Sequence, residues 1–85
     1  MKRSELIQII ESKKSVLCVG LDPDIRKLPK SYGSNAKGLA QFCKDIIDST
    51  ADHAVAYKPN LAFFESLGSS GWEALAEVAE YLKGF

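Results

Sequence analysis

Apolar positions follow two different spacings along this chain. Over Lys37–Asp52 they recur three and four residues apart, which predicts a helix with one buried face formed by Leu39, Phe42, Cys43, Ile46, Ile47 and Thr50. By contrast, Ser15–Leu21 and His53–Lys58 are almost continuous apolar runs, the second of them stopped by Pro59. Short runs of this kind are typical of parallel strands that are covered on both faces.

A shorter helix and a loop surround the first predicted strand. The N-terminal helix has an apolar face of Leu6, Ile7, Ile9 and Ile10, and Ser4 is its expected N-cap. The polar stretch Asp22–Ala36 holds two of the three prolines together with Gly33, so we expect a loop there.

Two further helices are expected after the second strand. The first spans Leu61–Leu67 and ends at Gly68, because glycine readily adopts the left-handed conformation that closes a helix. The second spans Ser70–Lys83, where Ser70 and Glu73 have the spacing of a capping box. Its expected buried stripe consists of Trp72, Leu75, Ala76, Ala79 and Leu82. The aromatic side chains expected in the core are Phe63, Phe64, Trp72 and Tyr81.

The predicted order is helix, strand, helix, strand, helix, helix. This alternation predicts an α/β fold in which parallel strands are joined by right-handed crossovers. Two strands cannot bury the apolar faces of all these helices, so we expect the architecture to continue beyond the 85 residues, with Phe85 as the first residue of another strand.

Composition narrows the class of protein. The chain is 46% apolar and 26% charged, as in globular domains, and no apolar run approaches the roughly 20 residues of a membrane span. Eleven basic residues balance eleven acidic ones, which argues against a partner such as nucleic acid or an anionic membrane. Cys18 and Cys43 lie in apolar segments, which indicates buried, reduced thiols, and with the single His53 they form no metal motif.

Charged residues follow both predicted strands. Asp22 comes directly after the first strand and Lys58 ends the second. Ligands of α/β folds bind beyond the carboxyl ends of strands, where this pair could hydrogen-bond sugar hydroxyls or position another charge. The residues alone leave alternatives open: Asp22 could cap the turn at Pro23, Lys58 could be a solvated strand end, and Asn60 could cap the short helix that follows it.

Four sequence segments together resemble the orotidine 5′-phosphate decarboxylases of the longer bacterial subfamily. They are LCVGLDPD (17–24), IID (46–48), AYKPNLAFFE (56–65) and GWEAL (71–75). The resemblance implies a (β/α)8 barrel, a cytoplasmic homodimer and no metal or organic cofactor. It also implies conversion of orotidine 5′-phosphate to uridine 5′-phosphate and carbon dioxide. Residues 1–85 would then be the N-terminal part of one barrel domain, ending before its third strand.

The resemblance also assigns roles to residues at the strand ends. Asp22 and Lys58 match substrate-binding residues near the ribose, with Lys58 in the charged network behind the reacting carbon, and Asn60 is a minor candidate. The family's third-strand motif, Asp-x-Lys-x-x-Asp, does not occur here, so we expect catalysis from the parent enzyme and none from these residues alone. Two alternatives stay open: a small α/β binding or structural module, and part of another sugar-phosphate decarboxylase of the same superfamily.

Overall fold

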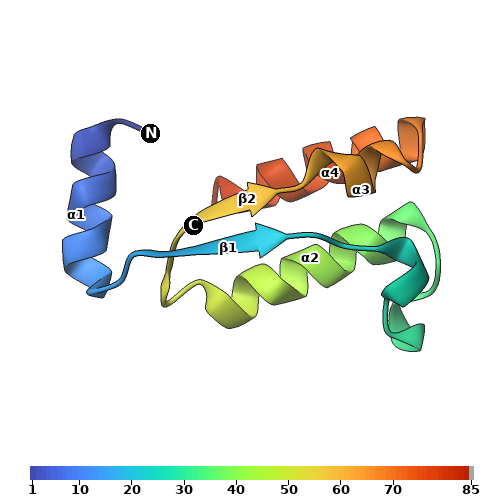
Figure 1. The fold of residues 1–85 in the computed structure, drawn as a ribbon, viewed down its shortest axis with the longest axis horizontal. Coiled ribbons are helices and arrows are strands. Elements are labelled where there is room, and N and C mark those ends of the chain that lie inside the picture. Colours follow the sequence, from blue (N-terminus) through green and yellow to red (C-terminus); the bar gives the residue numbers. More distant parts are fainter. Residues whose placement is uncertain (85) are drawn as a thin grey trace.

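Two strands and several helices alternate in the computed structural model, which describes residues 1–84 (Figure 1). The elements are α1 (Arg3–Lys13), β1 (Leu17–Leu21), the 3-10 turns η1 (Ile25–Lys27) and η2 (Lys30–Tyr32), α2 (Ala36–Thr50), β2 (Ala54–Pro59), α3 (Leu61–Glu65) and α4 (Ser69–Leu82). This order confirms the α/β prediction, with boundaries that move by a few residues at most. The expectation that Phe85 begins another strand lies outside the described residues.

The two strands pair in parallel, as predicted. Cys18 lies opposite Ala56 and Gly20 opposite Lys58, and the register is irregular between Leu17 and Cys18. The carboxyl ends of both strands therefore finish side by side, at the right-hand end of the sheet in Figure 1.

One face of this sheet forms the core, whereas the other is largely open. Leu21 is buried, and Val19 and Tyr57 pack against the same core cluster. Because side chains alternate between the two faces of a strand, Cys18 and Gly20 lie on the opposite face, and both are exposed. The prediction that the strands are covered on both faces is therefore wrong for β1 over the described residues.

Helix α2 supplies much of the buried surface. Leu39, Cys43 and Ile47 are all at most 1% exposed, which confirms the face predicted from their spacing. The helix begins after Asn35, whose side chain accepts a hydrogen bond from the Gly38 amide at 2.9 Å.

Helix α4 confirms the predicted stripe only in part, because Leu75 and Leu82 pack against the core cluster whereas its fully buried residues lie on a neighbouring face. Its buried residues are Gly71, Ala74 and Val78, whereas Trp72 is 48% exposed. The reason is steric, since a Cβ atom on Gly71 would lie only 1.7 Å from the carbonyl oxygen of Phe64. Only a face that begins with a glycine can approach α3 this closely, and the bulkier Trp72 face cannot.

The start of α4 also corrects a prediction. Gly68 has the positive φ expected of this glycine, 64°, but its ψ of −142° is not that of a left-handed helical cap; Ser66 is the C-cap of α3, and Gly68 serves as the N-cap of α4. Because the helix starts at Ser69, Ser70 lies inside its first turn and forms no capping box.

Helix α1 lies across the amino ends of the strands and buries none of its residues fully (Figure 1). Ser4 is within the helix rather than its cap, because the helix begins one residue after Lys2. Lys13 holds this helix in place: its Nζ donates hydrogen bonds to the carbonyl oxygens of Ala51 at 2.5 Å and Ala54 at 2.9 Å.

The contact at Gly71 generates a stability prediction. Gly71→Ala should lower the free energy of unfolding by about 3 kcal/mol, because the new methyl group must displace the backbone of α3. Gly84→Ala is the matched control, since its Cβ would make only an ordinary 3.5 Å contact with the Tyr81 carbonyl oxygen. Urea unfolding followed by far-UV circular dichroism measures both variants, and equal midpoints would contradict the steric account.

Candidate functional site

Asp22 and Lys58 both lie at the carboxyl edge of the sheet, at the ends of paired strands. Lys58 is the register partner of Gly20, and the backbone amide of Asn60 donates to the Leu21 carbonyl at 2.9 Å, which ties the two strand ends together. The Asp22 carboxylate turns back over Gly20. Its Oδ2 atom lies 3.4 Å from the position that a Cβ atom on Gly20 would take. The carboxylate thus lies over the residue that faces Lys58.

Both charged side chains are exposed and have no polar partner in the described chain. Within residues 1–84, the side chains of Asp22 and Lys58 take part in no hydrogen bond or ion pair. The two groups are therefore available to a ligand, one as an anionic acceptor and the other as a cationic donor.

Asp24, rather than Asp22, stabilises the turn after β1. Its Oδ1 accepts from the Arg26 amide at 3.0 Å and caps η1, and its Oδ2 forms an ion pair with the Arg26 guanidinium at 3.2 Å. The side-chain hydrogen bond from Arg26 lowers the pKa of Asp24. The alternative in which Asp22 serves as the turn cap is therefore wrong.

Asn60 has the structural role that its sequence position indicates. Its Oδ1 accepts a hydrogen bond from the Ala62 amide at 3.2 Å, and this caps α3. Its Nδ2 donates to no group in the described chain, so Asn60 also has an unused hydrogen-bond donor at the carboxyl edge.

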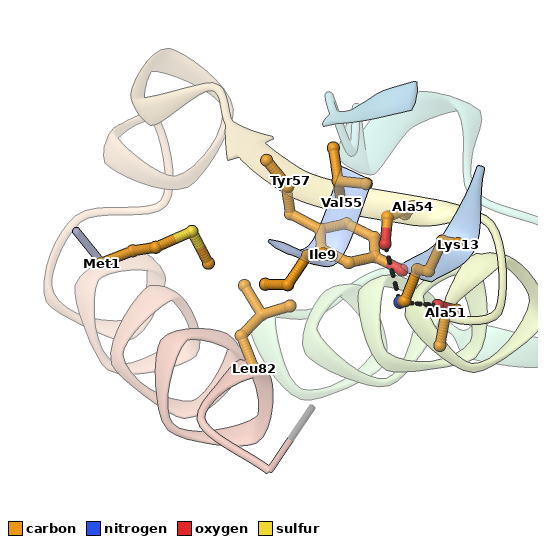
Figure 2. A pocket seen from close by; sticks show the side chains of 9 residues that line it. Met1, Ile9, Lys13, Ala51, Ala54, Val55, Tyr57 and Leu82 are labelled. Atoms are coloured by element: carbon orange, nitrogen blue, oxygen red, sulfur yellow. Dashed lines mark hydrogen bonds between the residues drawn. The ribbon is translucent and has the colours of Figure 1, made fainter. Parts of the chain in front are cut away.

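An apolar cavity of about 370 Å³ lies at the opposite end of the sheet (Figure 2). Ile9 of α1, Val55 and Tyr57 of β2, and Leu82 of α4 contribute to its lining. The Tyr57 hydroxyl is already hydrogen-bonded to Thr50 Oγ1 at 2.8 Å and donates to the Ile47 carbonyl at 3.1 Å. Because the cavity offers few polar groups, the open carboxyl edge is the better candidate for chemistry.

The two cysteines differ in their surroundings. Cys43 is buried, and burial raises the pKa of its thiol to about 11. Cys18 is exposed on the open face of the sheet, so the expectation of two buried thiols is wrong for Cys18. His53 is also exposed.

Over residues 1–84, no three His, Cys, Asp or Glu side chains gather in a way that could hold a metal ion. None of the described helices has the length and apolar character needed to cross a membrane.

Parallel strands covered by helices, with free polar side chains at their carboxyl edge, define the class of α/β proteins that bind ligands at that edge.

No protein-family model matches the chain. The orotidine 5′-phosphate decarboxylase of Leptospira interrogans is 53% identical over 81 residues, which cover 95% of this chain and 30% of that protein. The enzyme of Bacteroides fragilis strain YCH46 is 47% identical over 83 residues, which cover 98% of this chain and 30% of the enzyme.

Solved structures that resemble this chain come from the same family as these relatives. A Toxoplasma gondii protein assigned as an orotidine-monophosphate decarboxylase superposes with a TM-score of 0.84 at 41% identity, over 92% of this chain and 26% of that one. The Leishmania donovani OMP decarboxylase gives a TM-score of 0.69 at 38% identity, over 89% of this chain and 28% of that one. The chain is therefore a homologue of the orotidine 5′-phosphate decarboxylases, and it spans about 30% of the length of the curated relatives described above.

The thiols provide a test of this part of the structure. Iodoacetamide at pH 8.5 should modify Cys18 in the native chain and leave Cys43 unmodified, because Cys43 is buried and its raised pKa of about 11 keeps it protonated. Peptide mass spectrometry identifies the modified residue, and unfolding in urea should make both residues reactive. Rapid native modification of Cys43 would contradict the packing of α2.

Proposed function

We propose that this chain is the N-terminal part of a (β/α)8-barrel enzyme that decarboxylates orotidine 5′-phosphate to uridine 5′-phosphate. Asp22 and Lys58 bind the substrate near its ribose in this proposal, and Asn60 adds a donor through Nδ2. The observation that carries the proposal is the free Asp22 carboxylate folded over Gly20, the register partner of Lys58, in a chain 53% identical to such an enzyme.

The charges at this edge suit the chemistry of decarboxylation. Loss of carbon dioxide leaves its bonding electron pair on the pyrimidine ring, and a fixed ammonium group such as that of Lys58 lowers the energy of the developing carbanion. Asp22 is an acceptor for sugar hydroxyls. A proton must then reach the ring carbon, and we propose that residues outside this chain deliver it.

The open parts of the described structure support a larger barrel. The sheet has just two strands over residues 1–84, so each strand has an unpaired edge, and Cys18 and Gly20 are exposed on its open face. In a barrel, further strands pair with these edges and the open face becomes the interior. We further propose a homodimer in the cytoplasm that needs no cofactor, on the basis of the family resemblance.

A chimera tests the proposed site directly. In it, residues 1–85 replace the matching segment of the Leptospira interrogans enzyme, and we expect the chimera to decarboxylate orotidine 5′-phosphate. Lys58→Met and Asp22→Asn should each lower kcat/KM by about 10²-fold or more, because each removes a preorganised charged contact. A spectrophotometric decarboxylation assay measures the effect.

The matched control is Lys83→Met. Lys83 follows the last residue of α4, away from the candidate site, and forms an exposed ion pair with Glu80. This variant should retain the activity of the chimera, and the isolated 85-residue chain should show none. An active Lys58→Met chimera would rule out the proposed role of Lys58.

Enclosure by the proposed barrel can be followed at Cys18. This thiol is exposed in the described chain, whereas it lies inside the barrel in our proposal. Its alkylation rate in the folded chimera should therefore be at least about tenfold lower than in the isolated chain, because reagent reaches it only during local opening. Equal rates in the two proteins would argue against an enclosed sheet.

A further inference from the structure

The segment between β1 and α2 begins at Asp22 and ends at Asn35, the N-cap of α2. Its first half is fixed by apolar packing: Pro23 is less than 2% exposed, and Ile25 and Leu28 pack against the core cluster. The second half, from Pro29 to Asn35, has no fully buried residue, so its position depends on other contacts.

The side-chain contacts of this second half come from Asn35 and, above all, from Tyr32. Its hydroxyl donates a hydrogen bond of 2.5 Å to Asp45 Oδ2 on α2, and Gln41 Nε2 donates to the other carboxylate oxygen at 2.9 Å. The Tyr32 ring also meets Phe42 edge-to-face, with centroids 5.4 Å apart. The hydroxyl contact lowers the pKa of Asp45 and raises that of Tyr32, so the bond retains its charge-assisted form at neutral pH.

The backbone of Tyr32 is seated on α2 as well. A Cβ at Gly38 would lie 1.8 Å from the Tyr32 carbonyl oxygen, so the segment rests directly on the first helical turn. Asn35 closes the same turn through its hydrogen bond from the Gly38 amide at 2.9 Å. Side-chain and backbone contacts therefore converge on Tyr32.

We propose that Tyr32 is a positioning residue, whose bond to Asp45 holds segment 22–35 in the conformation that receives substrate beside Asp22. This inference rests on the proposed function. When the bond is lost, the outer half of the segment samples more conformations, and substrate must select the competent one. Such selection weakens binding without altering the chemical step.

A second bond of the same chemistry provides the matched control. The Tyr81 hydroxyl donates to Asp48 Oδ1 at 2.6 Å and joins α4 to α2, away from segment 22–35. Tyr32→Phe and Tyr81→Phe each remove one hydroxyl that donates to an aspartate of α2, but only the first loosens the segment.

The test uses the active chimera. Tyr32→Phe should raise the KM for orotidine 5′-phosphate about three- to tenfold with kcat unchanged, the range expected for loss of one hydrogen bond. Trypsin should also cleave more quickly after Lys30, an exposed residue of the outer half. Tyr81→Phe should change neither quantity. Adding Tyr32→Phe to Asp45→Ala should raise KM no further, because the bond is already lost.

Several results would overturn the inference. They are an unchanged KM in Tyr32→Phe, even with faster cleavage, and an equal rise of KM in Tyr81→Phe, which would indicate general destabilisation. Cleavage by trypsin can be measured even if the chimera is folded but inactive. In that case, unchanged cleavage in Tyr32→Phe would also refute the idea that the Tyr32–Asp45 bond holds the segment. Accelerated cleavage in Tyr32→Phe of an inactive chimera would instead support that idea and count against the proposed function.

Discussion

The parallel pairing of β1 and β2 is the constraint on which the candidate site depends. With Gly20 opposite Lys58, the two strands finish together, and Asp22 leaves the sheet beside the end of β2. A one-residue change of register would turn the Lys58 side chain to the opposite face of the sheet. The amide of Asn60, bonded to the Leu21 carbonyl at 2.9 Å, secures this alignment at the edge itself. The chemistry proposed for Asp22 and Lys58 is thus a consequence of strand register.

Sequence spacing predicted the strands and α2 well, because their burial follows directly from periodicity. Leu39, Cys43 and Ile47 are both the apolar positions of the pattern and the buried residues of α2. Spacing was less successful for α4, where Trp72 of the predicted stripe is exposed and Gly71, outside that stripe, faces the core. Periodicity measures hydrophobicity, but close approach of two backbones selects small residues, and the neighbouring backbone is not encoded in the local pattern.

The candidate site shows the same division between local and non-local information. Asp22 and Lys58 could be located because a strand end is visible in the sequence. In contrast, either aspartate of Asp22-Pro23-Asp24 is a reasonable turn cap, and only the position of Arg26 relative to the folded turn selects Asp24. The Tyr32–Asp45 bond joins residues 13 positions apart across a loop and a helix, a contact that no short-range spacing indicates.

The exposed face of the sheet connects the proposed chemistry with the proposed barrel. Side chains alternate along β1, so that Leu21 is buried in the core whereas Cys18 and Gly20 lie on the open face of the sheet. The Asp22 carboxylate is folded over Gly20 on that face. In water, a carboxylate and an ammonium group attract each other and a ligand only weakly, because solvent screens both charges. Enclosure by further strands would exclude that solvent and strengthen the same interactions many-fold. The residues of this chain would then have the charges that catalysis needs, and the rest of the barrel would give those charges their effect.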